Sequence, residues 1–472
     1  MEKILAGLIA SALAAAALAG SEPWSVTVDP SVTIGPIRPM NAVNGGPTSK
    51  FSGTQEAWRQ ARIPFGRTHD MNHSWEWGGP HTIDVAAVFP NFSANENDPK
   101  SYDFFYTDQA LDVMRRCGTE PVYRLGPSIE SGEKRYHTHP PKDFAKWARV
   151  AEKIIRHLNE GWADGRRFGI RYWEIWFEPD LGPRAWSGTK EQFLEFYKTV
   201  ALHLKACFPS LKIGGPGFAS ALGWKEDFIP FCRRERIPLD FYSWHCYNSN
   251  PRAMGKKARE VREWLNANGF EKTESLLDEW NYVTQWGGGE WAYSRQVESG
   301  RFIQKGTAFA AAVMSEIQAS PVDLLMYYDT RLHGGMNMLF EPVSARTMKG
   351  YYPFYAWSKL LFDYGTQVQA KVSATALGRD APGTGLGQLY ATAAKDAAGR
   401  LAVWLARYST DDNVQDWRKV KVVLPKDCVG RRVTCHLTDD IRTSTEVGVD
   451  RDKDGSLKLT LVPNSFAVVE VW

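Results

Sequence analysis

The chain has 472 residues, of which 43% are hydrophobic and 24% charged, a composition typical of a globular protein and not of a disordered one. Its formal charge of +3 comes from 57 basic and 54 acidic residues scattered without a basic run, which argues against nucleic acid or an anionic membrane as a partner. The length exceeds that of an ordinary domain, so we expect one large domain and a smaller one.

The N-terminal 19 residues are expected to form a signal peptide. Lys3 precedes the uncharged run Ile4–Ala19, which ends in the small-x-small sequence Ala17-Leu18-Ala19. This run is shorter than the roughly 20 residues that a membrane-spanning helix needs, although an uncleaved anchor is the alternative. We expect cleavage after Ala19, a secreted or periplasmic location, and no membrane span after cleavage, because no other stretch of the sequence qualifies.

Between about Ile37 and Trp357, short strand-like segments alternate with longer segments of helical period. Eight such strands predict a parallel sheet closed into an α/β (β/α)8 barrel, or TIM barrel, over residues 37–361. An open doubly wound sheet is the alternative, but no glycine-rich phosphate-binding motif opens any of the helices. The eight expected strands are Pro39–Asn44, Ile63–His69, Glu120–Leu125, Gly169–Trp176, Leu211–Gly215, Leu239–His245, Ser275–Trp280 and Val322–Tyr328.

After about Leu361 the sequence changes to short β-rich segments separated by turns, which predicts an antiparallel β-sandwich over residues 362–472. Residues 20–36 also have the pattern of strands and are expected to pair with this sandwich. Among the six cysteines, Cys428 and Cys435 flank a turn and could form a disulfide across a hairpin. The other four are equally compatible with reduced, buried side chains.

The working residues of a barrel enzyme lie at the carboxyl ends of its strands. Glu178 ends the fourth expected strand and Glu279 the seventh, so their side chains should face one another across the mouth of the barrel. Glycoside hydrolysis needs such a pair, because one carboxylic acid protonates the departing oxygen while a second carboxylate attacks the anomeric carbon or activates water. On position alone, two ordinary salt-bridged glutamates are the alternative.

Several motifs occur along the barrel in a defined order. Tyr172–Asp180 contains Trp-Phe-Glu-Pro-Asp, Asp278–Asn281 reads Asp-Glu-Trp-Asn, and Gly214–Gly217 reads Gly-Gly-Pro-Gly. Asp240–His245 ends in a histidine, and Gly45–Pro47 follows the first strand. Together they resemble glycoside hydrolase family 39, which includes β-xylosidases and α-L-iduronidases, over essentially the whole barrel. The resemblance implies a retaining double displacement on a carbohydrate substrate, and no metal or organic cofactor.

Position by position, the resemblance implies that Glu178 is the general acid/base, Glu279 the nucleophile and His245 a residue near the substrate. Tyr247 is placed to donate a hydrogen bond to the nucleophile and keep it ionised. Further candidates for substrate contact at the strand ends are Arg67, His69, Asp70, Trp75, Phe177, Trp280 and Asp329.

One residue departs from the family pattern. Phe177 stands where the family has the asparagine that contacts the 2-hydroxyl of the sugar, and a phenyl ring cannot make that hydrogen bond. Either the substrate has an unusual 2-position, or Arg67 or Asn281 replaces the asparagine, or catalysis is impaired. We therefore expect a glycoside hydrolase, with a carbohydrate-binding pseudoenzyme or a transglycosylase as the alternatives.

Overall fold

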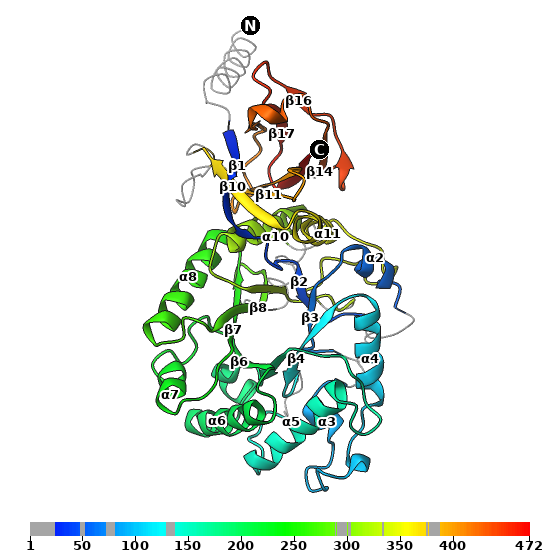
Figure 1. Ribbon diagram of the computed structural model, residues 1–472, viewed down its shortest axis with the longest axis vertical. Helices are drawn as coiled ribbons and strands as arrows, with labels where there is room; N and C mark the ends of the chain where they lie inside the picture. Colours follow the sequence, from blue (N-terminus) through cyan, green and yellow to red (C-terminus); the bar gives the residue numbers. More distant parts are fainter. Residues whose placement is uncertain are drawn as a thin grey trace.

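The computed structural model of the protein describes residues 24–47, 52–71, 81–128, 137–287, 289, 300, 304–332, 335–373, 376 and 388–472. A closed barrel of eight parallel strands lies beside a ten-stranded, mainly antiparallel sheet (Figure 1). The predicted barrel is confirmed, and each expected strand overlaps one of its strands. The predicted signal peptide lies outside the described residues, and no helix among those described is long and apolar enough to cross a membrane.

Side chains alternate along each strand, so every second residue faces the interior of the barrel. These inward-facing residues change from apolar to polar along the barrel axis. Phe65, Tyr172, Phe241 and Leu276 point inward and fill one end. Two residues further along the same strands, the inward positions are polar, and this polar layer supports the mouth. The barrel strands are β2 Ala42–Asn44, β3 Phe65–Arg67, β4 Glu120–Leu125, β5 Tyr172–Ile175, β6 Lys212–Phe218, β7 Phe241–Asn248, β8 Glu274–Tyr282 and β9 Leu324–Tyr327.

The helices surround the barrel and cover its outer face with apolar side chains (Figure 1). In α6, Phe193, Tyr197, Val200 and Leu204 form one buried helical face, as their spacing predicts. The α-helices are α2 Gln55–Gln60, α3 Val85–Val88, α4 Phe105–Arg116, α5 Phe144–Asn159, α6 Lys190–Cys207, α7 Phe228–Arg234, α8 Pro251–Ala267, α10 Gln304–Gln318 and α11 Tyr351–Lys359; shorter helical turns are η1 Pro99–Ser101, η2 Pro179–Arg184, η4 Leu360–Tyr364 and η6 Lys426–Cys428.

The second sheet joins the two ends of the chain, because β1 pairs with β10 on one side and with β13 on the other. One face of the sheet encloses its own apolar core. The opposite face packs on the barrel, where the indole of Trp404 donates a hydrogen bond of 3.1 Å to the carbonyl of Ala311 in α10. Its strands are β1 Trp24–Pro36, β10 Thr366–Val372, β11 Gln388–Lys395, β12 Leu401–Tyr408, β13 Arg418–Val423, β14 Val433–Thr438, β15 Thr445–Glu446, β16 Asp450–Arg451, β17 Leu457–Leu461 and β18 Ser465–Val471.

The possible hairpin disulfide between Cys428 and Cys435 is not formed. All six cysteines lie in the described part of the chain, and all are free thiols. Cys428 and Cys435 are each buried, but they belong to different apolar clusters of the sheet. Both thiols therefore serve as small apolar side chains.

Candidate active site

Glu178 lies in a turn that follows β5. The backbone of Trp176 and of Glu178 is left-handed, with φ of 71° and 40°, and the amide of Glu178 donates to the carbonyl of Gly217 over 2.8 Å. This turn leaves the Glu178 side chain only 10% exposed. Burial raises the pKa of Glu178 to about 7, although Arg67 and Arg184 oppose the shift.

Glu279 points into the barrel because β8 contains a bulge. Trp244 of β7 pairs with Leu277, but the next residue of β7, His245, pairs with Glu279, so Asp278 is an extra residue in β8. Adjacent side chains normally point to opposite faces of a strand. Here both carboxyls reach the same guanidinium: Arg67 Nη1 lies 2.6 Å from Glu279 Oε1 and Arg67 Nε lies 3.1 Å from Asp278 Oδ2.

The carboxylate of Glu279 has a partner on each oxygen. Arg67 binds Oε1, and the hydroxyl of Tyr247 donates a hydrogen bond of 2.7 Å to Oε2, as predicted from the position of Tyr247. Burial raises the pKa of Glu279, while the neighbouring His245, the charge of Arg67 and the Tyr247 hydroxyl act in the opposite direction. The two glutamates thus differ, because among the residues that the structure describes Glu279 alone of the two has a cation in direct contact.

His245 lies between the two glutamates. Its Nδ1 is 2.8 Å from Glu178 Oε1 and 3.4 Å from Glu279 Oε2. Burial lowers the pKa of His245 to about 4, so the imidazole is neutral near pH 7. An oxygen of Glu178 and an oxygen of Glu279 lie within 4.8 Å of each other and of His245. These donor atoms are near enough to hold a metal ion, but the adjacent Arg67 already supplies a positive charge and would repel a cation.

Two further buried carboxyls, those of Glu174 and Asp278, contact the same Arg67 guanidinium as Glu279 does. Glu174 is fully buried. It accepts one hydrogen bond of 2.6 Å from Arg67 Nε and another of 2.6 Å from the Ser243 hydroxyl. Burial disfavours its charge, but Arg67 holds the pKa of Glu174 below its ordinary value. Burial and the charge of Glu174 raise the pKa of Asp278 well above its ordinary value, which favours the protonated form of this carboxyl. Sequence reasoning missed Asp278, because strand alternation alone does not reveal a bulge.

His69 and Phe177 lie side by side next to Glu279 and form part of the wall of the site. The two rings are 4.7 Å apart, and Phe177 is fully buried with the guanidinium carbon of Arg124 at 6.0 Å from its centroid. Among the described residues, neither ring nitrogen of His69 has a hydrogen-bond partner, and Nε2 lies 3.7 Å from Glu279 Oε1. Burial lowers the pKa of His69 well below its ordinary value, so a neutral donor and acceptor faces the site.

The rim of the site is built by the segment after β9. The hydroxyl of Tyr328 donates a hydrogen bond to the carboxylate of Asp70. The guanidinium of Arg331 forms an ion pair with Asp329 and donates a hydrogen bond of 2.9 Å to the Tyr328 hydroxyl. Trp286, which is 63% exposed, contacts the ring of Tyr247 edge-on at 5.2 Å. Arg331, whose side chain is 27% exposed, and Trp286 therefore extend the site toward solvent.

Of the expected contact residues that the structure describes, Trp280 does not join this group. Trp280 is fully buried and packs against Phe309 of α10 and Tyr327, so its prediction as a platform for substrate is wrong. The residue follows the inward-facing Glu279 and therefore points outward. Trp75 lies outside the described residues. The amide of Asn281 donates to the carbonyls of Tyr328 and Met336, so it positions the rim and is not available to replace the asparagine missing at Phe177.

The sequence matches a known family and several curated relatives. The model of the family described as glycosyl hydrolases family 39 matches residues 25–321. A β-xylosidase of Caldicellulosiruptor saccharolyticus is 27% identical over 236 residues, which are 47% of this chain and 46% of that protein. A β-xylosidase of Geobacillus stearothermophilus is 29% identical over 196 residues, 39% of this chain and 37% of the relative. The matched region thus spans less than half the length of these curated relatives.

Solved structures share the fold over nearly the whole chain. A glucosidase from Croceicoccus marinus superposes with a TM-score of 0.74 at 22% identity, covering 96% of this chain and 99% of the other. A monomeric β-xylosidase from Caulobacter crescentus CB15 gives a TM-score of 0.68 at 16% identity, with 95% and 99% covered. Because the family model matches more than half of the sequence, the chain belongs to glycosyl hydrolase family 39.

Proposed function

We propose that the protein is a retaining glycoside hydrolase in which Glu178 is the general acid/base and Glu279 the nucleophile. The observation that carries the proposal is the approach of the two carboxyls, which have oxygens within 4.8 Å of each other. Retaining enzymes place this pair about 5–5.5 Å apart, whereas inverting enzymes leave about 6.5–9.5 Å for a water molecule. The separation supports direct attack on the anomeric carbon.

In the first step, the general acid Glu178 must be protonated before the substrate reacts. Glu178 has a pKa of about 7 because it is buried, so a large fraction carries the proton near neutral pH. That proton passes to the glycosidic oxygen as the bond to the anomeric carbon breaks. Glu279, held by Arg67 and Tyr247, forms the new bond to that carbon. The products of the step are a glycosyl-enzyme ester and the free leaving alcohol.

In the second step, water replaces the leaving alcohol. Ester formation removes the negative charge of Glu279, which favours ionisation of the nearby Glu178. Ionised Glu178 accepts a proton from water as the water attacks the anomeric carbon, and Glu279 leaves as a carboxylate. The sugar is released with its original anomeric configuration, and both glutamates return to their starting protonation states.

The buried walls of the site support a sugar substrate. Within the described part of the chain, the ring nitrogens of His69 near Glu279 have no hydrogen-bond partner, as a hydroxyl-binding residue should, and Arg331 and Trp286 supply a donor and a ring at the rim. Relatives named as β-xylosidases, an α-1,4-L-rhamnosidase and an α-L-iduronidase indicate which oligosaccharides and polysaccharides to try first. We infer an O-glycoside substrate whose terminal sugar packs beside Phe177.

The experiment is sugar release by the purified protein from a panel of glycans and aryl glycosides, followed by proton NMR of the first-formed anomer. We expect release with retention, and loss of release in Glu279→Ala. Release with inversion would contradict the double displacement. Binding without release would indicate a carbohydrate-binding protein, and transfer of the sugar to another glycan in place of water would indicate a transglycosylase.

A further inference from the structure

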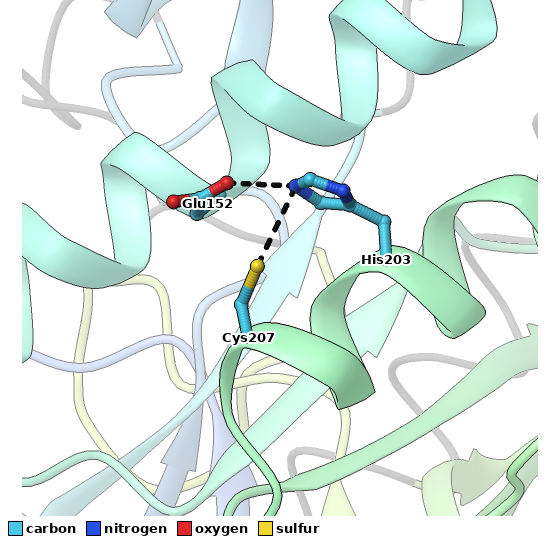
Figure 2. Close-up of side chains that lie close together, drawn as sticks. All are labelled: Glu152, His203 and Cys207. Carbon is cyan, nitrogen blue, oxygen red and sulfur yellow. Dashed lines mark hydrogen bonds and ion pairs between the residues drawn. The ribbon is translucent and has the colours of Figure 1, made fainter.

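The helices on the outside of the barrel carry a second cluster of reactive side chains, which includes neither catalytic glutamate. Glu152 lies on α5, and His203 and Cys207 lie four residues apart on the neighbouring α6 (Figure 2). His203 Nε2 is 2.7 Å from Glu152 Oε2 and 3.8 Å from Cys207 Sγ. One donor atom from each residue lies within 4.8 Å of the other two.

The geometry does not fit a nucleophilic triad of cysteine, histidine and carboxylate. In such a triad the imidazole contacts the nucleophile through one nitrogen and the carboxylate through the other. Here the carboxylate and the thiol both meet the same nitrogen, Nε2, as the converging dashed lines in Figure 2 show. Burial and the charge of Glu152 also raise the pKa of Cys207, which opposes an activated thiolate.

Three donor atoms that converge on one point are instead the arrangement of metal ligands. We propose that Glu152, His203 and Cys207 form a binding site for a zinc-class divalent transition metal ion. Thiolate, imidazole and carboxylate are the three protein ligand types of zinc, and histidine and cysteine four residues apart on a helix point to the same side. The ion would sit between α5 and α6 with water as its fourth ligand, because the His203 side chain is 31% exposed.

Only a small shift is needed to admit the ion. Zinc bound at about 2.0–2.1 Å to nitrogen and oxygen in tetrahedral geometry sets these two atoms about 3.3 Å apart. Glu152 Oε2 must therefore withdraw from His203 Nε2 by about 0.6 Å, the difference between that spacing and the present 2.7 Å. The other oxygen, Oε1, accepts a 2.7 Å hydrogen bond from Arg156 Nε, which leaves Oε2 as a single ligand.

The charge balance also favours a divalent cation. On coordination the Cys207 thiol loses its proton to solvent, and the thiolate joins the carboxylate of Glu152 as a second negative ligand. The two ligand charges neutralise the ion, while the guanidinium of Arg156 shares its charge between Glu152 and Glu160. Arg156 also acts on the Cys207 thiol, so its charge lowers the affinity for the ion while leaving all three ligand atoms in place.

A metal here would join the two helices that flank β5 in sequence. α5 precedes β5 and α6 follows it, and β5 leads to Glu178. We therefore expect a structural effect, a higher melting temperature with the ion bound, and no part in the chemistry at the barrel mouth.

The test uses the reduced full-length protein titrated with Co²⁺, whose bond to a thiolate gives a charge-transfer absorption band in the near ultraviolet. We expect this band to saturate at one ion per chain and to be displaced by Zn²⁺. Cys207→Ser should abolish it, whereas Cys246→Ser, which alters the other half-buried cysteine, should retain it. Absence of the band in the unaltered protein, or its survival in Cys207→Ser, overturns the proposal.

A second measurement does not depend on the thiol. Zn²⁺ should raise the melting temperature of the unaltered protein, and His203→Gln should remove most of that rise while the metal-free protein still melts cooperatively. An equal rise in the two proteins would show that zinc binds elsewhere and would also overturn the proposal. Neither measurement requires glycosidase activity, so failure here is distinct from failure of the proposed function.

Discussion

The guanidinium of Arg67 and the carboxylate of Glu279 form a fully buried ion pair, with Nη1 2.6 Å from Oε1. The same guanidinium contacts Glu174 at 2.6 Å and Asp278 at 3.1 Å. One cation therefore serves three acidic side chains inside the barrel. Arg67 favours the charged forms of Glu174 and Glu279, while burial and the charge of Glu174 raise the pKa of Asp278.

Arg67→Met should remove that cation at nearly constant volume. We expect destabilisation of about 3–5 kcal/mol, since breaking a buried ion pair leaves an uncompensated charge. The pKa of Glu279 should rise further, so that residual activity shifts to higher pH. Thermal unfolding and a pH profile of kcat/KM measure the two effects. The control Arg67→Lys keeps the charge but lacks the forked donors, and it should recover more stability than Arg67→Met.

Replacing Glu178 by alanine should separate acid catalysis from attack by the nucleophile. General acid catalysis contributes about 10²- to 10⁴-fold, so hydrolysis of glycosides with poor leaving groups should fall by that order. Aryl glycosides with activated leaving groups need little protonation and should still form the glycosyl-enzyme. Added azide should then accelerate turnover of Glu178→Ala and yield a glycosyl azide. Equal losses for both kinds of substrate would exclude Glu178 as the acid.

The pH dependence of kcat/KM should reflect the environment of Glu178. Its pKa is about 7, and the acid must be protonated, so activity should decline above about pH 7, tenfold for each further pH unit. The acidic limb belongs to Glu279, which must be ionised and whose pKa is raised by burial. The alkaline limb should disappear in Glu178→Ala with an activated substrate. Persistence of the limb there would assign it to another group.

Substitutions at Phe177 test whether the absence of the family's asparagine determines which sugar the protein prefers. Phe177→Asn restores an amide beside His69, and Phe177→Leu removes the ring without adding a donor. Both variants should lose stability, because the ring is fully buried. Only the asparagine variant should change the ratio of kcat/KM between substrates that differ at the 2-position, by roughly tenfold or about 1.4 kcal/mol. Unchanged activity and preference in Phe177→Asn would refute a specificity role.

Much of this site is predictable from sequence, because strand ends in a barrel converge whatever the detailed packing. Glu178, Glu279, Tyr247 and His245 lie together for that reason. The placements of Asp278, Glu279 and Trp280 follow from the bulge in β8. It turns Asp278 and Glu279 to the same side and Trp280 outward, and the sequence has no glycine or proline at this point to signal it.

Trp286 is expected to contribute to substrate binding and not to the chemical step. Its ring is 63% exposed and touches Tyr247, whose hydroxyl binds the nucleophile, so a sugar at the rim can stack on it. Trp286→Ala should raise KM roughly tenfold, or about 1.4 kcal/mol, with little change in kcat, because stacking at the rim is equal in the ground and transition states. The matched control is Trp417→Ala, since Trp417 is 70% exposed on the second sheet and should leave both constants unchanged. A fall in kcat with KM unaltered would instead mean that Trp286 acts through Tyr247 on Glu279, in which case Tyr247→Phe should reproduce the loss.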